Sequence, residues 1–458
     1  MSRYFVCATT LISTALLLSA CGGEKSQSNT PASSDIATSN CFWQGPYSID
    51  NPASNFAYPD SGATYWSTRY QLPAGATLQL NGKFPHARYM SLNSYQEIAG
   101  TYVPVDSIAD SAIIPDQGAT NPFINGNARN SDERSYSLTI AAGTAPEPRA
   151  DNTIYDTVND EQAVLLYRIY VPDQGKSITG GVQLPEPVLT LNGQQYTGQA
   201  ACDELKNVQG LESIPLVPAQ QYAAATKNPA NIIGDMNPNP QPVWKAAYNF
   251  VYSIQCNFFG ACFDLGTNTK PARQVGWFAN LDNQYMAAYL DRSIKPVVVI
   301  RGQLPEVPET LNGDEVFNSD NAQLRYWSIC QNEYYSQKVS ACLYDEQITI
   351  NPDGKYTIVT SRAADRPSNA TEQCGIGFLP MSESGDGFGD MVAGQVNDTD
   401  ATMLLIRNML PMNGFANTIQ NTSTPGDEAA VLGDYMPSAT YYTVEEFEAL
   451  GCDAYTAL

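Results

Sequence analysis

The sequence has a single histidine and few positive charges, and each shortage excludes a class of function. Lys and Arg together number 24 against 47 Asp and Glu, which gives a net charge of -23. A polyanion repels phosphate, and nucleic-acid readers carry clustered Lys and Arg, so nucleic acid is not expected as a partner. One histidine also excludes metal centres built on two or more imidazoles, including the H-E-x-x-H hydrolases.

Two motifs are also missing. The sequence has no close C-x-x-C pair, which excludes a zinc ribbon, and no G-x-S-x-G nucleophile elbow, which excludes an α/β-hydrolase. Long helical periodicity is scarce. Short apolar runs instead alternate with polar ones and are separated by Asn-Gly, Asp-Gly and Pro-Asp turn signals, as in Leu78–Gly82 and Pro352–Gly354. This pattern is typical of a β-rich protein.

The N-terminus has the features of an export signal. Residues 1–20 combine a basic start with an apolar stretch from Phe5 to Leu18, too short for a stable membrane span. The ending Leu18-Ser19-Ala20-Cys21 resembles the lipobox of bacterial lipoproteins, in which the cysteine carries the lipid, palmitate included, and anchors the chain to a membrane. Residues 21–40 are small and polar, which predicts a flexible tether. Gly22 after the lipidated cysteine resembles sorting to the outer membrane of Gram-negative bacteria.

The cysteine count predicts disulfides. Of the ten cysteines, one lies in the leader and one is Cys21, and the remaining even number in an exported chain favours bridges. Two pairs are suggested by proximity along the chain: Cys256 with Cys262 as a short loop clip, and Cys330 with Cys342 across a hairpin. The other two pairs, assigned by elimination, are Cys41 with Cys202 and Cys374 with Cys452.

The body of the chain contains one set of motifs twice. Four segments of the first copy match four segments of the second in the same order, the first pair at an offset of 220 that also places Tyr65 on Tyr285. The matched pairs are Leu78–Pro85 with Val298–Pro305, Arg88–Leu92 with Arg325–Ile329, Tyr136–Ile140 with Tyr356–Thr360, and Leu165–Pro172 with Leu404–Pro411. An internal repeat of this kind predicts two homologous domains.

We therefore expect an all-β protein of two tandem antiparallel domains of jelly-roll or sandwich type, with few short helices. The expected boundaries are 41–205 for the first domain, 206–244 for a linker and 245–458 for the second domain. Thr443 and Glu446 form a capping box that predicts a C-terminal helix closed by Gly451, and a similar short helix is expected at Cys202–Leu205.

Some of these segments resemble a bacterial family. Arg168-Ile169-Tyr170-Val171-Pro172, with Gly180-Gly181 and Pro185–Val188 after it, and Trp327-Ser328-Ile329 before a hairpin resemble the C-terminal β domain of proteins catalogued as domains of unknown function 1254 and 1214. The resemblance implies jelly-roll domains and lends no agreed activity. The second copy departs from the pattern, with Asn408 and Met409 where an aromatic residue is expected.

His86 is the one imidazole that could serve as a general base. Arg88 and Tyr89 follow it closely, and Ser67 and Asp60 could complete a catalytic site. The second copy has no equivalent histidine. This asymmetry fits an active first copy, and it equally fits a loop residue without a catalytic role.

Arginines occupy matching places in the two copies. Arg168 matches Arg407, and Arg88 matches Arg325, each within an apolar strand. An arginine in a strand can clamp a carboxylate or phosphate. Its presence in both copies favours the alternative, a buried arginine that pairs with an acid and fixes the sheet.

Two other features could bind ligands. Acidic, glycine-containing turns around Asp386 and Asp390 could hold calcium, although the spacing is not that of an EF-hand. Aromatic side chains of the first copy could line a concave sheet face that suits sugars or apolar ligands, although antiparallel cores also consist of aromatics; these residues are Tyr65, Trp66, Tyr70, Tyr89 and Tyr95.

Two functions remain open. The leading hypothesis is a non-catalytic, lipid-anchored protein of the cell envelope, in the periplasm or on the outer membrane, that binds a small molecule, a glycan or an envelope protein. The alternative is a hydrolase or lyase with a cleft in the first domain around His86, Arg88 and Tyr89.

Overall fold

The structure is a computed structural model, and it describes residues 39–98, 101–156, 162–206, 237–249, 273, 278–312 and 322–458. The expected leader, the lipidated Cys21, most of the tether and linker, and the Cys256–Cys262 pair lie outside these residues. Within the described residues, no helix has the length and apolar character needed to cross a membrane.

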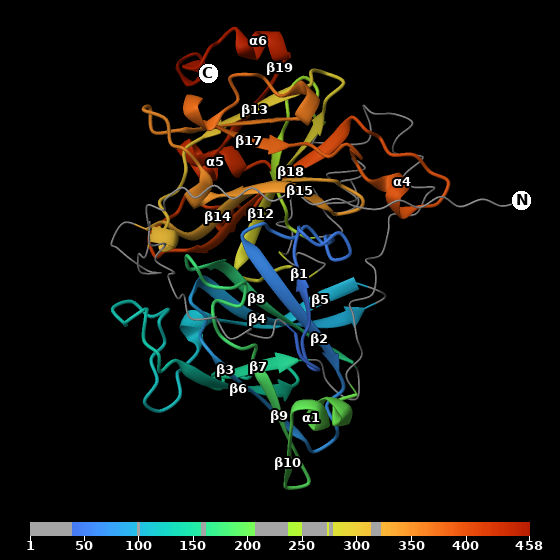
Figure 1. The fold of residues 1–458 in the computed structure, drawn as a ribbon, viewed down its shortest axis with the longest axis vertical. Helices are drawn as coiled ribbons and strands as arrows, with labels where there is room; N and C mark the ends of the chain where they lie inside the picture. The colour runs from blue at the N-terminus through green and yellow to red at the C-terminus, as the bar shows by residue number, and fades with distance from the viewer. Residues whose placement is uncertain are drawn as a thin grey trace, which may run out of the picture. The chain divides into compact units, whose positions relative to one another are not determined.

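The first half of the chain forms two five-stranded sheets (Figure 1). The first sheet has the order β1 (Gln44–Tyr47), β2 (Ala63–Tyr70), β8 (Ala163–Pro172), β4 (Ala87–Ile98), β5 (Thr101–Ala109). The second sheet has the order β10 (Gln194–Thr197), β9 (Glu186–Leu191), β3 (Thr77–Lys83), β6 (Ser135–Ala142), β7 (Thr153–Asp156). We call this unit the first half.

The second half of the chain repeats this arrangement in the yellow to red strands of Figure 1. Its five-stranded sheet has the order β11 (Trp244–Ala246), β12 (Asn283–Asp291), β18 (Ala401–Pro411), β14 (Leu324–Asn332), β15 (Val339–Tyr344). Its four-stranded sheet has the order β17 (Ile376–Pro380), β16 (Tyr356–Ser361), β13 (Val297–Gly302), β19 (Ser438–Tyr442).

Strand order and register confirm the internal repeat. The four matched segments fall on β3 and β13, β4 and β14, β6 and β16, and β8 and β18, which occupy equivalent places in the sheets. Arg168 on β8 lies opposite Tyr65, and Arg407 on β18 lies opposite Tyr285. The pairs β6–β7 and β16–β17 are parallel, which differs from the fully antiparallel domains that the sequence predicted.

Each half has a core between its two sheets, as in a sandwich. The central strand β8 is buried on both faces. Successive side chains of a strand point to opposite faces, so Leu165, Tyr167 and Ile169 enter the core of the first half while Arg168 and Tyr170 point away from it. Because the outward residues are also buried, the outer face of this sheet must be covered as well.

Helices are few and short, as expected. In the described ranges the α-helices are α1 (Gly198–Glu204), α4 (Phe388–Met391), α5 (Glu428–Leu432) and α6 (Val444–Glu448). The capping box of Thr443 and Glu446 is present at the start of α6. Helix α1 begins at Gly198, four residues before the expected Cys202, because β10 ends directly before it. The same part of the chain also contains short 3₁₀-helices. They are Asp110–Ala112, Thr310–Asn312, Asp345–Gln347, Ala363–Asp365, Glu372–Cys374, Ile419–Asn421, Gly433–Tyr435 and Ala454–Thr456.

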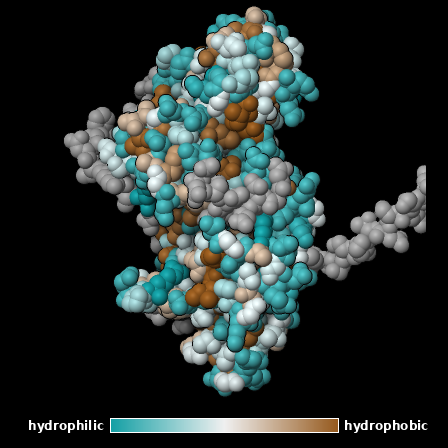
Figure 2. Space-filling view, turned by 90° about the vertical axis from the view of Figure 1, so that its left-hand side faces the viewer, coloured by the Kyte–Doolittle hydropathy of each residue, from teal (hydrophilic) through white to brown (hydrophobic). Residues whose placement is uncertain are grey.

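Three disulfides join described residues: Cys41 with Cys202, Cys330 with Cys342, and Cys374 with Cys452. They match the pairs expected from the sequence for these six cysteines. Three disulfides indicate an oxidising, extracytoplasmic location. The surface agrees with a solvated chain, since Figure 2 shows a face on which hydrophilic side chains surround smaller apolar patches.

The Cys41–Cys202 bridge links residues 161 positions apart, and this predicts a large contribution to stability. Replacing both cysteines by alanine should lower the free energy of unfolding by about 5 kcal/mol in the chain-entropy description, measured by urea denaturation. In a reducing denaturation series the variant and the wild type should become equally stable. A difference that persists under reduction would instead be due to lost packing of the sulfur atoms.

Candidate ligand pocket at the seam

The outer face of the β8 sheet meets the equivalent face of the second half. Tyr170 on β8 contacts Tyr326 on β14, with ring centroids 5.1 Å apart, and both belong to one apolar cluster with Met409. We call the contacts between the sheets of β8 and β18, together with residues 56–62 and 278–283 that lead into β2 and β12, the seam. The seam explains why β8 and β18 are buried on both faces.

Two repeat-related ion pairs hold the seam. Arg88 donates to Asp345 at 2.5 Å and also to Glu346, and Arg325 lies 3.2 Å from Asp110. All but Glu346 are completely shielded from solvent at the side chain. Burial raises the pKa of both Asp110 and Asp345, and the facing guanidinium opposes the rise. Arg88 and Arg325 therefore match the alternative stated above, in which a buried arginine pairs with an acid and fixes the sheet.

A second reciprocal pair uses backbone carbonyls. Arg168 donates to the carbonyl oxygen of Phe278 at 2.5 Å, and Arg407 donates to that of Tyr58 at 2.5 Å. Each arginine thus reaches from one half into the other. Phe278 and Tyr58 have φ values of 56° and 53°, which are uncommon for bulky residues. The guanidinium bonds are part of what holds these backbones in that conformation.

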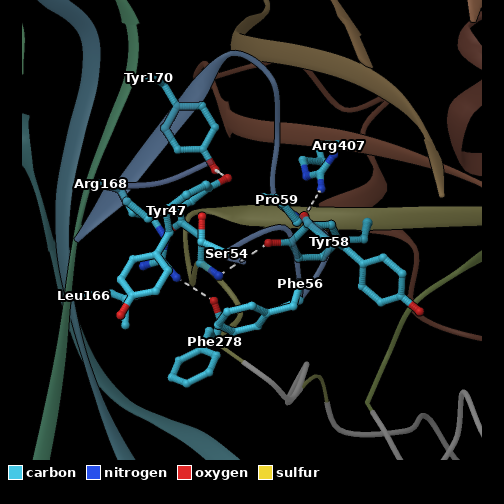
Figure 3. A pocket seen from close by; sticks show the side chains of 14 residues that line it. Tyr47, Ser54, Phe56, Tyr58, Pro59, Leu166, Arg168, Tyr170, Phe278 and Arg407 are labelled. Carbon is cyan, nitrogen blue, oxygen red and sulfur yellow. Dashed lines mark hydrogen bonds between the residues drawn. The ribbon is translucent and has the colours of Figure 1, made fainter. Parts of the chain in front are cut away.

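Between these two arginines lies a pocket of about 60 Å³ (Figure 3). It is lined mainly by aromatic side chains, with Arg168 and Arg407 contributing the charged groups. The lining residues are Tyr47, Ser54, Phe56, Ala57, Tyr58, Pro59, Tyr65, Leu166, Arg168, Tyr170, Phe278, Asn280, Tyr285 and Arg407.

The two arginines differ in how their charge is balanced. Arg407 lies 3.3 Å from the carboxylate of Asp60, which also accepts a hydrogen bond from Tyr326 at 2.6 Å. Among the described residues, no acid forms an ion pair with Arg168. At the offset of 220 between the copies, the position equivalent to Asp60 is Asn280. The two copies therefore share the arginine, Arg168 in one and Arg407 in the other. Only Arg407 has the acid, Asp60, as its counterion.

The tyrosines beside Arg168 do not replace the missing acid. Burial raises the pKa of Tyr65 and of Tyr95 to about 12, and it also raises the pKa of Tyr170. These phenols are therefore neutral near pH 7. They hydrogen-bond or stack with the guanidinium, and its positive charge remains uncompensated by them.

The residues of the catalytic hypothesis do not converge. His86 is half-buried, and its backbone N–H donates to the Gly180 carbonyl. Its imidazole has no hydrogen bond to a described acid or hydroxyl. Arg88 points to Asp345 instead, and Tyr89 donates to Asp282 at 2.6 Å.

The two residues expected to complete that site also lie elsewhere. Ser67 donates to the Tyr47 hydroxyl at 3.2 Å, and Asp60 pairs with Arg407. Of the five aromatic residues proposed for a concave face, Tyr65 lines the pocket, Trp66 and Tyr70 lie in the core of the first half, and Tyr89 and Tyr95 are buried at the seam.

The calcium hypothesis gains no cluster of ligands in the described part of the chain. Asp386 is buried and accepts hydrogen bonds from the N–H groups of Phe388 and Asp398, while Asp390 contacts Lys338 at 3.3 Å. The described residues contain one group of three ligating side chains, Asp60 with Cys330 and Cys342. Its two sulfur atoms form a disulfide, so it is not a metal site.

Phe278 and Asn280, two of the residues that define the pocket, were not predicted from the sequence. A signal was present. The offset that places Tyr65 on Tyr285 also places Tyr58 on Phe278 and Asp60 on Asn280. Extending the repeat by seven residues would have shown that one acid is replaced by an amide.

The fold and the pocket together define a disulfide-bonded, extracytoplasmic β protein of two sandwich-like halves.

No family model matches the sequence, and no curated protein matches it. Several solved structures are similar, among them two bacterial proteins. An uncharacterised protein of Burkholderia cenocepacia is 12% identical, with 89% of this chain and 83% of that one covered at a TM-score of 0.45. The VPA0106 protein of Vibrio parahaemolyticus is 13% identical, with 88% and 92% covered at a TM-score of 0.35.

The Arg88–Asp345 pair provides a test of the seam. Replacing Arg88 by methionine leaves a buried carboxylate without its main partner and should cost about 3–5 kcal/mol of unfolding free energy. The double variant Arg88→Met with Asp345→Asn should lose less than Arg88→Met alone, because the fully buried carboxylate at position 345 is then no longer present without its partner. Urea denaturation of the two singles and the double measures the coupling, and strictly additive losses would contradict a direct interaction.

His86 gives a second test, because a single histidine yields one imidazole signal in a proton NMR titration. Burial, with Arg134 and Lys176 nearby, lowers the pKa of His86 from 6.5 to about 4. The unfolded chain therefore takes up this proton first, so the His86 contribution to stability is lost as the pH falls from about 6.5 to about 4. The signal should titrate near pH 4, and a midpoint near 6.5 would contradict the placement. His86→Gln should remove this part of the pH dependence.

Proposed function

We propose that the protein is a non-catalytic, lipid-anchored binding protein of the bacterial cell envelope, and that the seam pocket is its binding site. One observation carries the proposal: the pocket contains a buried guanidinium, that of Arg168, without an acidic partner among the described residues. The three other buried arginines of the seam, Arg88, Arg325 and Arg407, each have a carboxylate partner.

The location rests on two features. Disulfides support export from the cytoplasm. The lipobox-like ending at Cys21 supports an acyl anchor, and Gly22 supports the outer membrane of a Gram-negative bacterium as the membrane partner. A relationship to the domains of unknown function 1254 and 1214 is also part of this proposal. It rests on the motifs Arg168–Pro172 and Trp327-Ser328-Ile329.

The enzymatic alternative receives less support. A hydrolase or lyase around His86 would need an acid or hydroxyl to orient the imidazole. Among the described residues its imidazole has none, and Arg88 and Tyr89 are engaged with residues of the second half. The pocket at the seam contains no histidine.

Thermal-shift screening of the full-length protein with small neutral and charged compounds tests the proposal. A compound that binds the native state raises the melting temperature in a concentration-dependent way. Leu166→Trp places an indole against the pocket and should abolish the shift. Ile114→Trp adds the same side chain at an exposed site outside the pocket and should preserve it. Shifts that survive Leu166→Trp would place binding elsewhere, and the absence of any shift would refute the proposal.

A further inference from the structure

We infer that the ligand of the seam pocket is a small organic carboxylate, and that its carboxylate group binds against Arg168. This inference rests on the proposed function, because it names the chemical class that the same pocket would take. It follows from the charge, the hydroxyl groups and the size of the pocket.

The charge argument begins with Arg168, whose exposed fraction is only 1%. Its hydrogen-bond acceptors among the described residues are all neutral: the Asn93 side chain, the Tyr95 hydroxyl at 2.6 Å and the Phe278 carbonyl at 2.5 Å. A buried charge that meets only neutral dipoles loses more hydration than it recovers. An anion in the adjoining pocket offsets this cost.

The other ionisable groups at the seam limit that anion to a single charge. Arg407 is already balanced by Asp60. Asp282, the acid that follows Asn280 by two positions, accepts a hydrogen bond from Tyr89, and it forms no ion pair with Arg168 in the described part of the chain. Arg168 is thus the guanidinium of this pocket that has no paired carboxylate, and a single guanidinium matches a monoanion better than a dianion such as phosphate.

Two hydroxyls on the pocket wall have protons available for a ligand. The Tyr47 hydroxyl accepts from Ser67 at 3.2 Å, and the Tyr285 hydroxyl accepts from the Asn280 N–H at 3.3 Å. Neither donates to a described group. Carboxylate oxygens accept several hydrogen bonds at once, and bonds to a charged acceptor are the stronger kind. Phe56, on the same wall, offers an apolar surface for the rest of the ligand.

Size restricts the class further. A cavity needs about 10–15 Å³ to hold one water molecule, so about 60 Å³ accommodates a ligand of roughly four to six non-hydrogen atoms. Acetate and propionate have this size. Larger acids would have to extend out of this pocket.

The first experiment compares a carboxylate with its neutral isostere. Isothermal titration calorimetry of the full-length protein, in a buffer free of carboxylates, uses acetate, propionate and acetamide, with chloride as a simple anion. Acetate and propionate should bind saturably, and acetamide at least tenfold more weakly. Chloride that binds as tightly as acetate would overturn the carboxylate assignment in favour of an inorganic anion.

The second experiment restores the missing counterion. Asn280→Asp places a carboxylate at the position equivalent to Asp60, which should neutralise Arg168 and weaken acetate and propionate binding at least tenfold. The matched variant Asn280→Ser removes the amide without adding charge and should retain most of the binding. Retained binding in Asn280→Asp would overturn Arg168 as the anchoring group.

The outcomes separate this inference from the proposed function. Neutral compounds that bind, with binding lost in Leu166→Trp, would refute the carboxylate and preserve the binding protein. No binding of any compound to the wild type would refute both. Circular dichroism of each variant reports whether it folds, and if Asn280→Asp does not fold, the comparison of acetate with acetamide on the wild type decides the matter.

Discussion

The burial of four arginines at the seam is the constraint on which the rest of the structure depends. Arg88, Arg168, Arg325 and Arg407 are each at most 2% exposed. A guanidinium removed from water must find acceptors for most of its donors, or the fold is penalised by several kcal/mol. The strands that carry these residues, and the loops that face them, are arranged to supply those acceptors.

Each half supplies what the other requires. Arg88 finds its acid in the 3₁₀-helix after β15, and Arg325 finds its acid in the 3₁₀-helix after β5. Arg168 and Arg407 reach carbonyls at the entry to β12 and β2. Because these contacts are reciprocal, separating the two sheets would break the ion pairs and expose large apolar rings to water. The seam is therefore a part of the fold, and a pocket within it has fixed walls.

A duplicated fold gains a specific site when one copy departs from the shared pattern. Here the departure is an amide for an acid, Asn280 for Asp60, at otherwise equivalent positions. The net charge of -23 works against an approaching anion, while the unpaired guanidinium of Arg168 attracts it. Salt screens the long-range repulsion more than the short-range attraction to a buried group. Selectivity for an anion in such a site therefore comes from the short-range contacts within the pocket. The acidic surface does not contribute to it.

The sequence by itself determined the β class, the repeat, the Cys330–Cys342 pair across a hairpin and the cap of α6, because each follows from local periodicity or spacing. The Cys41–Cys202 and Cys374–Cys452 pairs join distant segments, so the sequence offered them only by elimination and the fold decided them. Only the tertiary structure decided which residues form the site. His86, Arg88 and Tyr89 are neighbours in sequence, but strand alternation and the seam send their side chains to different partners. Arg168, Asn280 and Tyr47 are far apart in the chain and meet because the two sheets pack face to face, a long-range contact that no local pattern encodes.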